Sequence, residues 1–325
     1  MMSFWAGKRV LVTGGTGFIG SHLVEYLLQN QANIRTTARL KGRNSSWMQT
    51  YQECVDFIQG DLTDLDFCKR CCDGVDVVMH AAGKIAGLPY NFAHPAEMLT
   101  TNILLDTNVI EGAHKSGVKR YLYISGVTVY PPDAPMPTSE DQGLVGLPEA
   151  TVRGASWAKR IGEVQAQCYA AEYGMEVAIV RLGNVYGPRD DFSETTGHII
   201  GSVIRDVFSH RPPTIWGDGE QLRSYLFVTD AVRGLMWATE KYPKADPMNV
   251  GSTSEITIRD LVQLILKLTN SHLEVVFEKA WPVGHKRRLA DTRKARSILD
   301  FRPTVDLAEG LAKTIAWYRT AMLRA

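Results

Sequence analysis

Glycines near the N-terminus are the residues whose spacing predicts chemistry most directly. The segment Thr13-Gly14-Gly15-Thr16-Gly17-Phe18-Ile19-Gly20 places glycine at positions 14, 17 and 20, between a short apolar run and an amphipathic segment. A tight turn and the close approach of a pyrophosphate both require residues without Cβ, and the N-terminus of the helix that follows attracts phosphate. We therefore predict that Gly14, Gly17 and Gly20 help to bind a dinucleotide.

The end of the second expected strand should determine which dinucleotide is preferred. NAD-binding chains usually carry an acidic residue there, which holds the adenosine ribose. This chain has Ala38 instead, followed by the basic residues Arg39, Lys41 and Arg43. These side chains favour NADP because they can receive its additional phosphate, and NAD is the alternative. A basic loop in contact with solvent would have the same sequence.

Short apolar runs alternate with helical segments over the first 185 residues. The alternation predicts an α/β fold with a doubly wound parallel (Rossmann) sheet covered on both faces, hence a dinucleotide-binding domain over residues 1–185. After about Tyr186 the alternation weakens, so residues 186–325 are expected to form a smaller α/β nucleotide-sugar-binding domain, with some segments returning to the first. The expected strands are Arg9–Thr13, Asn33–Ala38, Val75–Met79, Arg120–Ser125 and Glu176–Leu182, and the expected helices include Ser21–Gln29 and Leu307–Ala321.

Composition excludes several classes of protein. The 325 residues are 45% hydrophobic and 22% charged, with a net charge of +1. Such a small charge argues against nucleic acid or an anionic membrane as the main partner. No apolar run approaches the roughly 18–20 residues that span a bilayer, and the first residues do not resemble a signal peptide. We expect a cytoplasmic protein.

The five cysteines are an odd number and do not predict a disulfide framework. Cys68 and Cys71 have a Cys-x-x-Cys spacing, but they fall in the expected short helix Leu65–Cys72, and no histidine lies nearby in the sequence. We expect these thiols to be small packing residues and expect no metal site.

Beyond the glycines, a series of motifs resembles the extended short-chain dehydrogenase/reductases, specifically the nucleotide-sugar epimerase/dehydratase family, over essentially the whole chain. Asn184–Phe192 and Gly197–Ile200 are most similar to the branch of GDP-fucose synthase and related GDP-sugar epimerase/reductases. The other matching stretches are Gly60–Leu62, His80–Gly83, Asn102, Ser125–Tyr130, Lys159–Glu163, Arg181–Pro188, Trp216–Arg223 and Arg288–Asp291.

The resemblance implies a set of contacts and a partner. Nucleotide-sugar contacts would come from Asn184, Arg223 and Arg288, with a GDP-sugar favoured over a UDP-sugar, since arginine forks pair well with diphosphates. Relatives form homodimers through helices that here span about residues 98–116 and 156–173, and the second has an apolar stripe that includes Ile161 and Val164. Cofactor contacts would come from Phe18, Ile19, Asp61, Leu62, Ala81, Ala82 and Lys159.

The catalytic pair of this family is a Tyr-x-x-x-Lys motif, whose two side chains lie one helical turn apart. Lys159 matches the lysine, but Ala155 occupies the tyrosine position, and none of the twelve tyrosines is followed four residues later by lysine. Gly126 stands where the family carries a hydroxyl, and Ser125 and Thr128 are displaced alternatives. In the fucose-synthase branch, a cysteine and a histidine serve as acid/base groups; Thr128 occupies the cysteine position and His198 matches the histidine.

Three explanations for Ala155 stay open. The first is that the change was engineered. The second is that another group, such as Ser156, Thr128 or a water, moves the proton, and the third is that the protein binds a nucleotide sugar without turnover. Loss of a general acid/base costs on the order of 10²–10⁴ in rate. The sequence therefore predicts an NAD(P)-dependent nucleotide-sugar epimerase/oxidoreductase that acts by hydride transfer at sugar C4, with impaired or altered proton transfer. The alternative is a catalytically inactive binding protein, or an engineered inactive variant.

Overall fold

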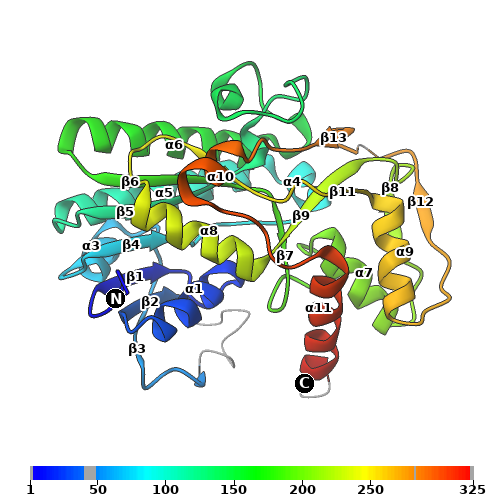
Figure 1. Cartoon of the computed structure of the whole chain (residues 1–325), viewed down its shortest axis with the longest axis horizontal. Coiled ribbons are helices and arrows are strands. Elements are labelled where there is room, and N and C mark those ends of the chain that lie inside the picture. The colour runs from blue at the N-terminus through cyan, green and yellow to red at the C-terminus, as the bar shows by residue number, and fades with distance from the viewer. Residues whose placement is uncertain (1–2, 40–48, 282, 323–325) are drawn as a thin grey trace.

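The structure is a computed structural model and describes residues 3–39, 49–281 and 283–322. Its larger part is a seven-stranded parallel sheet in the order β10-β6-β5-β4-β1-β2-β3 (Figure 1). The order reverses beside β1, so this is the doubly wound arrangement that the alternation predicts. The strands are β1 (Arg9–Thr13), β2 (Asn33–Ala38), β3 (Val55–Gln59), β4 (Val77–His80), β5 (Arg120–Gly126), β6 (Glu176–Leu182) and β10 (Met248–Val250).

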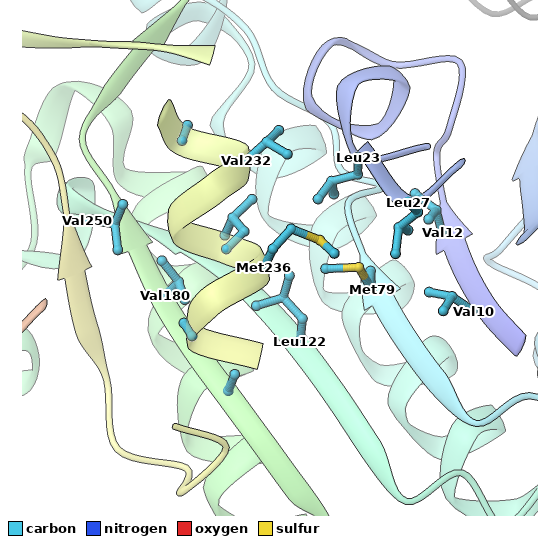
Figure 2. Packing of buried hydrophobic residues seen from close by; sticks show 14 of the residues in the cluster. Val10, Val12, Leu23, Leu27, Met79, Leu122, Val180, Val232, Met236 and Val250 are labelled. Carbon is cyan, nitrogen blue, oxygen red and sulfur yellow. The ribbon is translucent and has the colours of Figure 1, made fainter. Parts of the chain in front are cut away.

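Helices cover both faces of this sheet. On one face lie α1 (Phe18–Gln29) and α8 (Val228–Lys241), and Figure 2 shows Leu23, Leu27 and Met236 from these helices packed against apolar side chains of the strands. A second buried cluster on the other face joins the sheet to α3 (Leu65–Cys72), α5 (Pro95–Lys115) and α6 (Arg153–Tyr173). Because both faces are buried, the strands are apolar runs rather than alternating patterns.

The smaller part is built around short strands and has its own core (Figure 1). In the chain, helix α10 (Arg293–Leu299) follows the last strand of this smaller part and precedes the last helix. Its strands are β7 (Asn184–Tyr186), β9 (Leu222–Phe227), β11 (Glu255–Thr257) and β13 (Arg287–Arg288) in one sheet, with β8 (Thr214–Trp216) and β12 (Val276–Glu278) in a two-stranded sheet. Its helices are α7 (Ile199–Phe208), α9 (Ile258–Leu268) and α11 (Leu307–Met322). Helix α4 (Leu88–Ala93) follows β4 in the larger part.

Most predicted elements begin and end close to the predicted residues. Helix α1 begins at Phe18, three residues before the predicted start, because Gly17 is its N-cap and the glycine segment leads straight into it. Strand β4 ends at His80 and β5 at Gly126, each one residue later than predicted. Strand β3 was not predicted; it lies at the edge of the sheet, and only its first residue, Val55, is buried.

The thiols of α3 lie in the core. Cys68, Cys71 and Cys72 are buried, and burial raises the pKa of Cys68 to about 12 and that of Cys71 to about 11. Within the described ranges, no group of three or more His, Cys, Asp or Glu side chains is placed to hold a metal ion. In the same ranges, no helix is both long enough and apolar enough to cross a bilayer.

Candidate active site

The glycine segment makes the tight turn between β1 and α1. Gly14 has a φ of +68°, and a Cβ there would lie 2.9 Å from the Cα of Ala82. A Cβ on Gly20 would lie 2.2 Å from the carbonyl oxygen of Gly14. The first glycine is therefore required by its backbone conformation, and the last by the close packing of the helix on the turn.

A cavity of about 520 Å³ opens at the carboxyl ends of the parallel strands, where the residues after β4, β5 and β6 meet β9, α7 and β13. Ligands of doubly wound sheets bind at this edge. The cavity brings together twelve of the residues singled out from the sequence: Phe18, Ile19, Ala81, Ala82, Ser125, Thr128, Ala155, Lys159, Asn184, His198, Arg223 and Arg288.

Other predicted residues lie outside the wall of this cavity. Arg39 and Asp61 are exposed, and Leu62 is buried. The glycines Gly14, Gly17 and Gly20 lie in the adjoining turn rather than in the wall. Lys41 and Arg43, part of the argument for NADP, lie outside the described residues.

The start of α6 brings Ala155 and Lys159 to the cavity wall together. They are one helical turn apart, so a larger side chain at position 155 would project beside Lys159. The ammonium of Lys159 lies 5.0 Å from the centre of the Tyr123 ring. Position 155 is therefore open to the cavity beside Lys159.

The hydroxyl of Ser125 is turned to a buried ion pair. It donates a hydrogen bond of 2.5 Å to Glu163, whose carboxylate also accepts two hydrogen bonds, of 2.8 and 2.7 Å, from Arg181. Thr128 lies in the short turn Val127–Val129 that follows β5, and it also lines the cavity. Among the described residues, its hydroxyl has no carboxylate partner of this kind. Ser156, which the sequence offered as a substitute acid, is fully buried and lies outside the cavity wall.

Two partly buried arginines on neighbouring strands also line this cavity. Arg223 on β9 and Arg288 on β13 are register partners, and Glu149 lies 3.6 Å from Arg288. Burial, together with the charge of Arg223, lowers the pKa of Arg288 to about 9, and burial also lowers the pKa of Arg223. Two partly buried cations beside one acid leave an excess of positive charge, which suits a multiply charged anion.

Several acid or base residues near the cavity were not predicted, among them Glu149, His285 and Asp190. The carboxylate of Glu149 lies 2.6 Å from the imidazole of His285 behind the arginine wall. Asp190 is buried in the cavity wall, with its carboxylate 3.7 Å from the imidazole of His198. No sequence signal identifies Glu149 and His285, since they come from segments far apart in the chain. Asp190 stands within the motif Asn184–Phe192, but the motif alone does not distinguish it from its neighbours.

The turn, the sheet order and the cavity at the strand ends define a dinucleotide-binding protein of the Rossmann type. The chain belongs to the NAD dependent epimerase/dehydratase family, whose model matches residues 10–251. The predicted family and fold class are thereby confirmed.

Individual relatives align over nearly the whole chain. The dTDP-4-dehydro-6-deoxy-D-allose reductase of Streptomyces bikiniensis is 30% identical, with 97% of this chain and 97% of the relative aligned. The probable GDP-L-fucose synthase 1 of Oryza sativa subsp. japonica is 29% identical, with 96% of this chain and 92% of the relative aligned. A UDP-glucuronic acid 4-epimerase from Bacillus cereus, solved with UDP-glucuronic acid and NAD, superposes with a TM-score of 0.85 at 26% identity, over 96% and 99% of the chains. These similarities place the chain among NAD(P)-dependent nucleotide-sugar epimerases and reductases.

Proposed function

We propose that this chain is an NAD(P)-dependent nucleotide-sugar epimerase or oxidoreductase that acts at C4 of the sugar, with a proton transfer that does not use a tyrosine. The observation that carries the proposal is the shared cavity, which Lys159 and the paired arginines Arg223 and Arg288 all line. A nucleotide sugar whose diphosphate is bound by the two arginines would extend its sugar ring toward Lys159 and the glycine turn.

The cofactor site is proposed on the same wall as the glycine turn. Phe18, Ile19, Ala81 and Ala82 line the cavity beside Lys159, which would hold the nicotinamide ribose. Asp61 and Leu62 are proposed for the adenine end, which lies beyond the wall of this cavity. The bound dinucleotide supplies the hydride chemistry. We propose NADP over NAD, because Arg39 is exposed at the end of β2 and no acid occupies position 38.

The proton-transfer groups are proposed from the same wall. His198 is the ionisable side chain best suited to proton exchange near neutral pH, and Asp190 orients it. Thr128 would hydrogen-bond to a sugar hydroxyl from the position after β5. Ser125 contributes indirectly, because its hydroxyl donates a hydrogen bond that holds the carboxylate of Glu163 against β5.

The substrate is proposed to be a GDP-sugar, with a UDP-sugar as the alternative. Both kinds of nucleotide occur in the names of the relatives. Asn184 lies in the cavity wall, where its amide donates a hydrogen bond of 2.9 Å to the carbonyl of Ser224 on β9. This bond fixes its orientation next to the arginines.

The decisive test restores the phenol. The variant Ala155→Tyr should raise turnover of a GDP- or UDP-sugar by about 10²–10⁴, because it returns a general acid/base one turn from Lys159. Turnover is followed by the absorbance of the reduced nicotinamide and by product analysis, with NADPH and NADH compared. The double variant Ala155→Tyr with Lys159→Met is the control and should lose the gain. A variant with no gain on GDP-, UDP- or dTDP-sugars would contradict the proposal.

A second candidate function is binding without turnover. Ala155 and Gly126 favour it, since both positions that normally carry hydroxyls in this family lack them. A binding protein would hold the cofactor and the nucleotide sugar with no change in the absorbance of the bound nicotinamide. An absorbance change on addition of a nucleotide sugar to the unmodified protein would exclude it.

We also propose a homodimer formed through α5 and α6. Leu104 of α5 and Ile161 and Val164 of α6 are 44%, 41% and 42% exposed. These two helices pack side by side, so their outer faces together offer an apolar surface to a second copy.

A further inference from the structure

A buried acid lies behind the cavity, at a position that the sequence analysis did not single out. Asp106 of α5 is 3% exposed. One carboxylate oxygen lies 2.9 Å from Nε2 of His80, and the other accepts a hydrogen bond of 2.7 Å from the hydroxyl of Tyr123. The hydroxyl of Thr13 accepts a hydrogen bond from the amide of Ala82 and lies 2.8 Å from Nδ1 of His80. Because a carboxylate only accepts hydrogen bonds, Nε2 of His80 is the donor to Asp106.

Asp106 carries a negative charge at neutral pH. Burial alone would raise the pKa of this carboxyl, but the charge of Lys159 and the hydrogen bonds from His80 and Tyr123 hold its pKa below the usual value. A buried carboxylate needs a compensating cation. The charge of Lys159 of α6 is the largest of the contributions that keep this carboxylate ionised, ahead of those of His80 and Tyr123. Tyr121 on β5 also faces Asp106, and its pKa is raised by burial first and by this carboxylate second.

The ring of Tyr123 connects Asp106 to Lys159. Its hydroxyl binds the carboxylate, and its face lies under the ammonium at 5.0 Å. Gly162, one turn after Lys159, makes this possible, since a Cβ at that position would lie 2.0 Å from the Tyr123 hydroxyl. The glycine lets the phenol lie against α6 directly beneath the lysine.

We propose that Asp106 is a positioning residue for Lys159: through Tyr123 it fixes the aromatic ring under the ammonium, and its charge keeps that ammonium at the cavity wall. This inference rests on the proposed function, in which Lys159 holds the nicotinamide ribose. It explains how Lys159 keeps its place in a chain whose position 155 provides no phenol. The negative charge that attracts the ammonium of Lys159 is therefore on Asp106 of α5 rather than on a residue that lines the cavity.

The test is the variant Asp106→Asn, which keeps the shape and one accepting oxygen but removes the charge. Reductive methylation modifies only the uncharged amine of lysine, so its rate at Lys159, measured by mass spectrometry, should rise about five- to tenfold. The dissociation constants for NADPH and NADH, measured by nicotinamide fluorescence, should rise by about tenfold. A merely structural loss would not change the reactivity of one lysine.

Glu111→Gln is the matched control. Glu111 lies on the same helix, accepts a hydrogen bond of 2.6 Å from Tyr169 and lies 3.6 Å from Lys115, away from the cavity. It should leave the modification of Lys159 and the binding of the cofactor unchanged.

Tyr123→Phe keeps the ring but breaks its link to Asp106, and it should shift both measurements in the same direction by a smaller factor. It also carries the test if Asp106→Asn fails to fold. Unchanged reactivity of Lys159 in the folded variants would overturn the inference. Failure of the unmodified protein to bind either cofactor would overturn the proposed function instead, and the reactivity of Lys159 would still decide the inference.

Discussion

At the scale of single residues, Arg223 and Arg288 are the clearest sign of an anionic ligand. Burial first, and then repulsion from the charge of Arg223, lowers the pKa of Arg288, and Glu149 is the acid that lies near. A diphosphate placed between them would remove that repulsion. Part of the free energy of binding such a ligand would therefore come from relief of this repulsion between the two arginines.

Replacing Arg288 should weaken nucleotide binding selectively. Arg288→Met should raise the dissociation constants of GDP and UDP about 10- to 100-fold, because hydrogen bonds to charged groups contribute about 1.5–3 kcal/mol. Isothermal titration calorimetry measures the change. Arg287→Met is the control, since Arg287 is the next residue on β13 but is exposed and paired with Glu255. An equal loss of nucleotide affinity in the two variants would show that the effect comes from the total charge of the protein rather than from a binding site at Arg288.

Sequence reasoning identified individual residues only where a local motif carries them. Lys159 and the two arginines belong to short recognisable stretches, and the cavity brings them together. Asp106 and Glu149 were not identified from the sequence, because their importance depends on burial and on partners that lie far away in the chain, such as Tyr123 and His285. Even the orientation of Ser125 toward Glu163 follows from packing, which no spacing of residue types reports.

At the scale of elements, α1 is tied to the turn after β7. His22 lies 2.9 Å from the carbonyl oxygen of Pro188 through Nε2 and 2.5 Å from a guanidinium nitrogen of Arg189 through Nδ1. Burial, followed by the charge of Arg189, lowers the pKa of His22 to about 3. The helix that follows the glycine turn thus depends on an uncharged imidazole.

This dependence predicts acid sensitivity with a defined sign. Below the ordinary histidine pKa of 6.5, the unfolded chain takes up a proton at position 22 that the folded chain does not. The free energy of unfolding should therefore fall by about 1.4 kcal/mol per pH unit between about pH 6.5 and 3 on account of this group. Urea denaturation at pH 7, 6 and 5 should show a slope shallower by that amount in His22→Gln. His272→Gln, at an exposed site, should keep the slope of the unmodified protein; identical slopes in all three proteins would contradict the assignment.

The helices and strands that the sequence predicts correctly are those whose buried apolar residues form a run long enough to show a periodic pattern. Strands β1, β2 and β6 and helix α3 have the predicted ends. The strands of the smaller part are two to six residues long, and several have mixed exposure, so their sequences resemble loops. Strand β10 has three buried residues and owes its place to the edge of β6, a partner that the sequence does not reveal.

At the scale of the whole molecule, the apolar outer faces of α5 and α6 are the main evidence for self-association. Ile161→Glu places a charge in the centre of the proposed interface and should shift the protein from dimer to monomer in sedimentation velocity. Ile298→Glu is the control: Ile298 on α10 is 41% exposed, the same as Ile161, but lies on another surface. A monomeric unmodified protein would contradict the proposed dimer.

The path of the chain through the two sheets has a consequence for synthesis. The polypeptide leaves the large sheet after β6 and returns to it only at β10, after β7, β8, β9 and α8 have been made. During translation, therefore, one face of the sheet lacks α8 until residue 241 has emerged from the ribosome, and the edge of β6 lacks β10 until residue 250 has emerged. The nascent chain carries the finished glycine turn long before the sheet that supports it is complete, so this interval is when chaperones should be needed most.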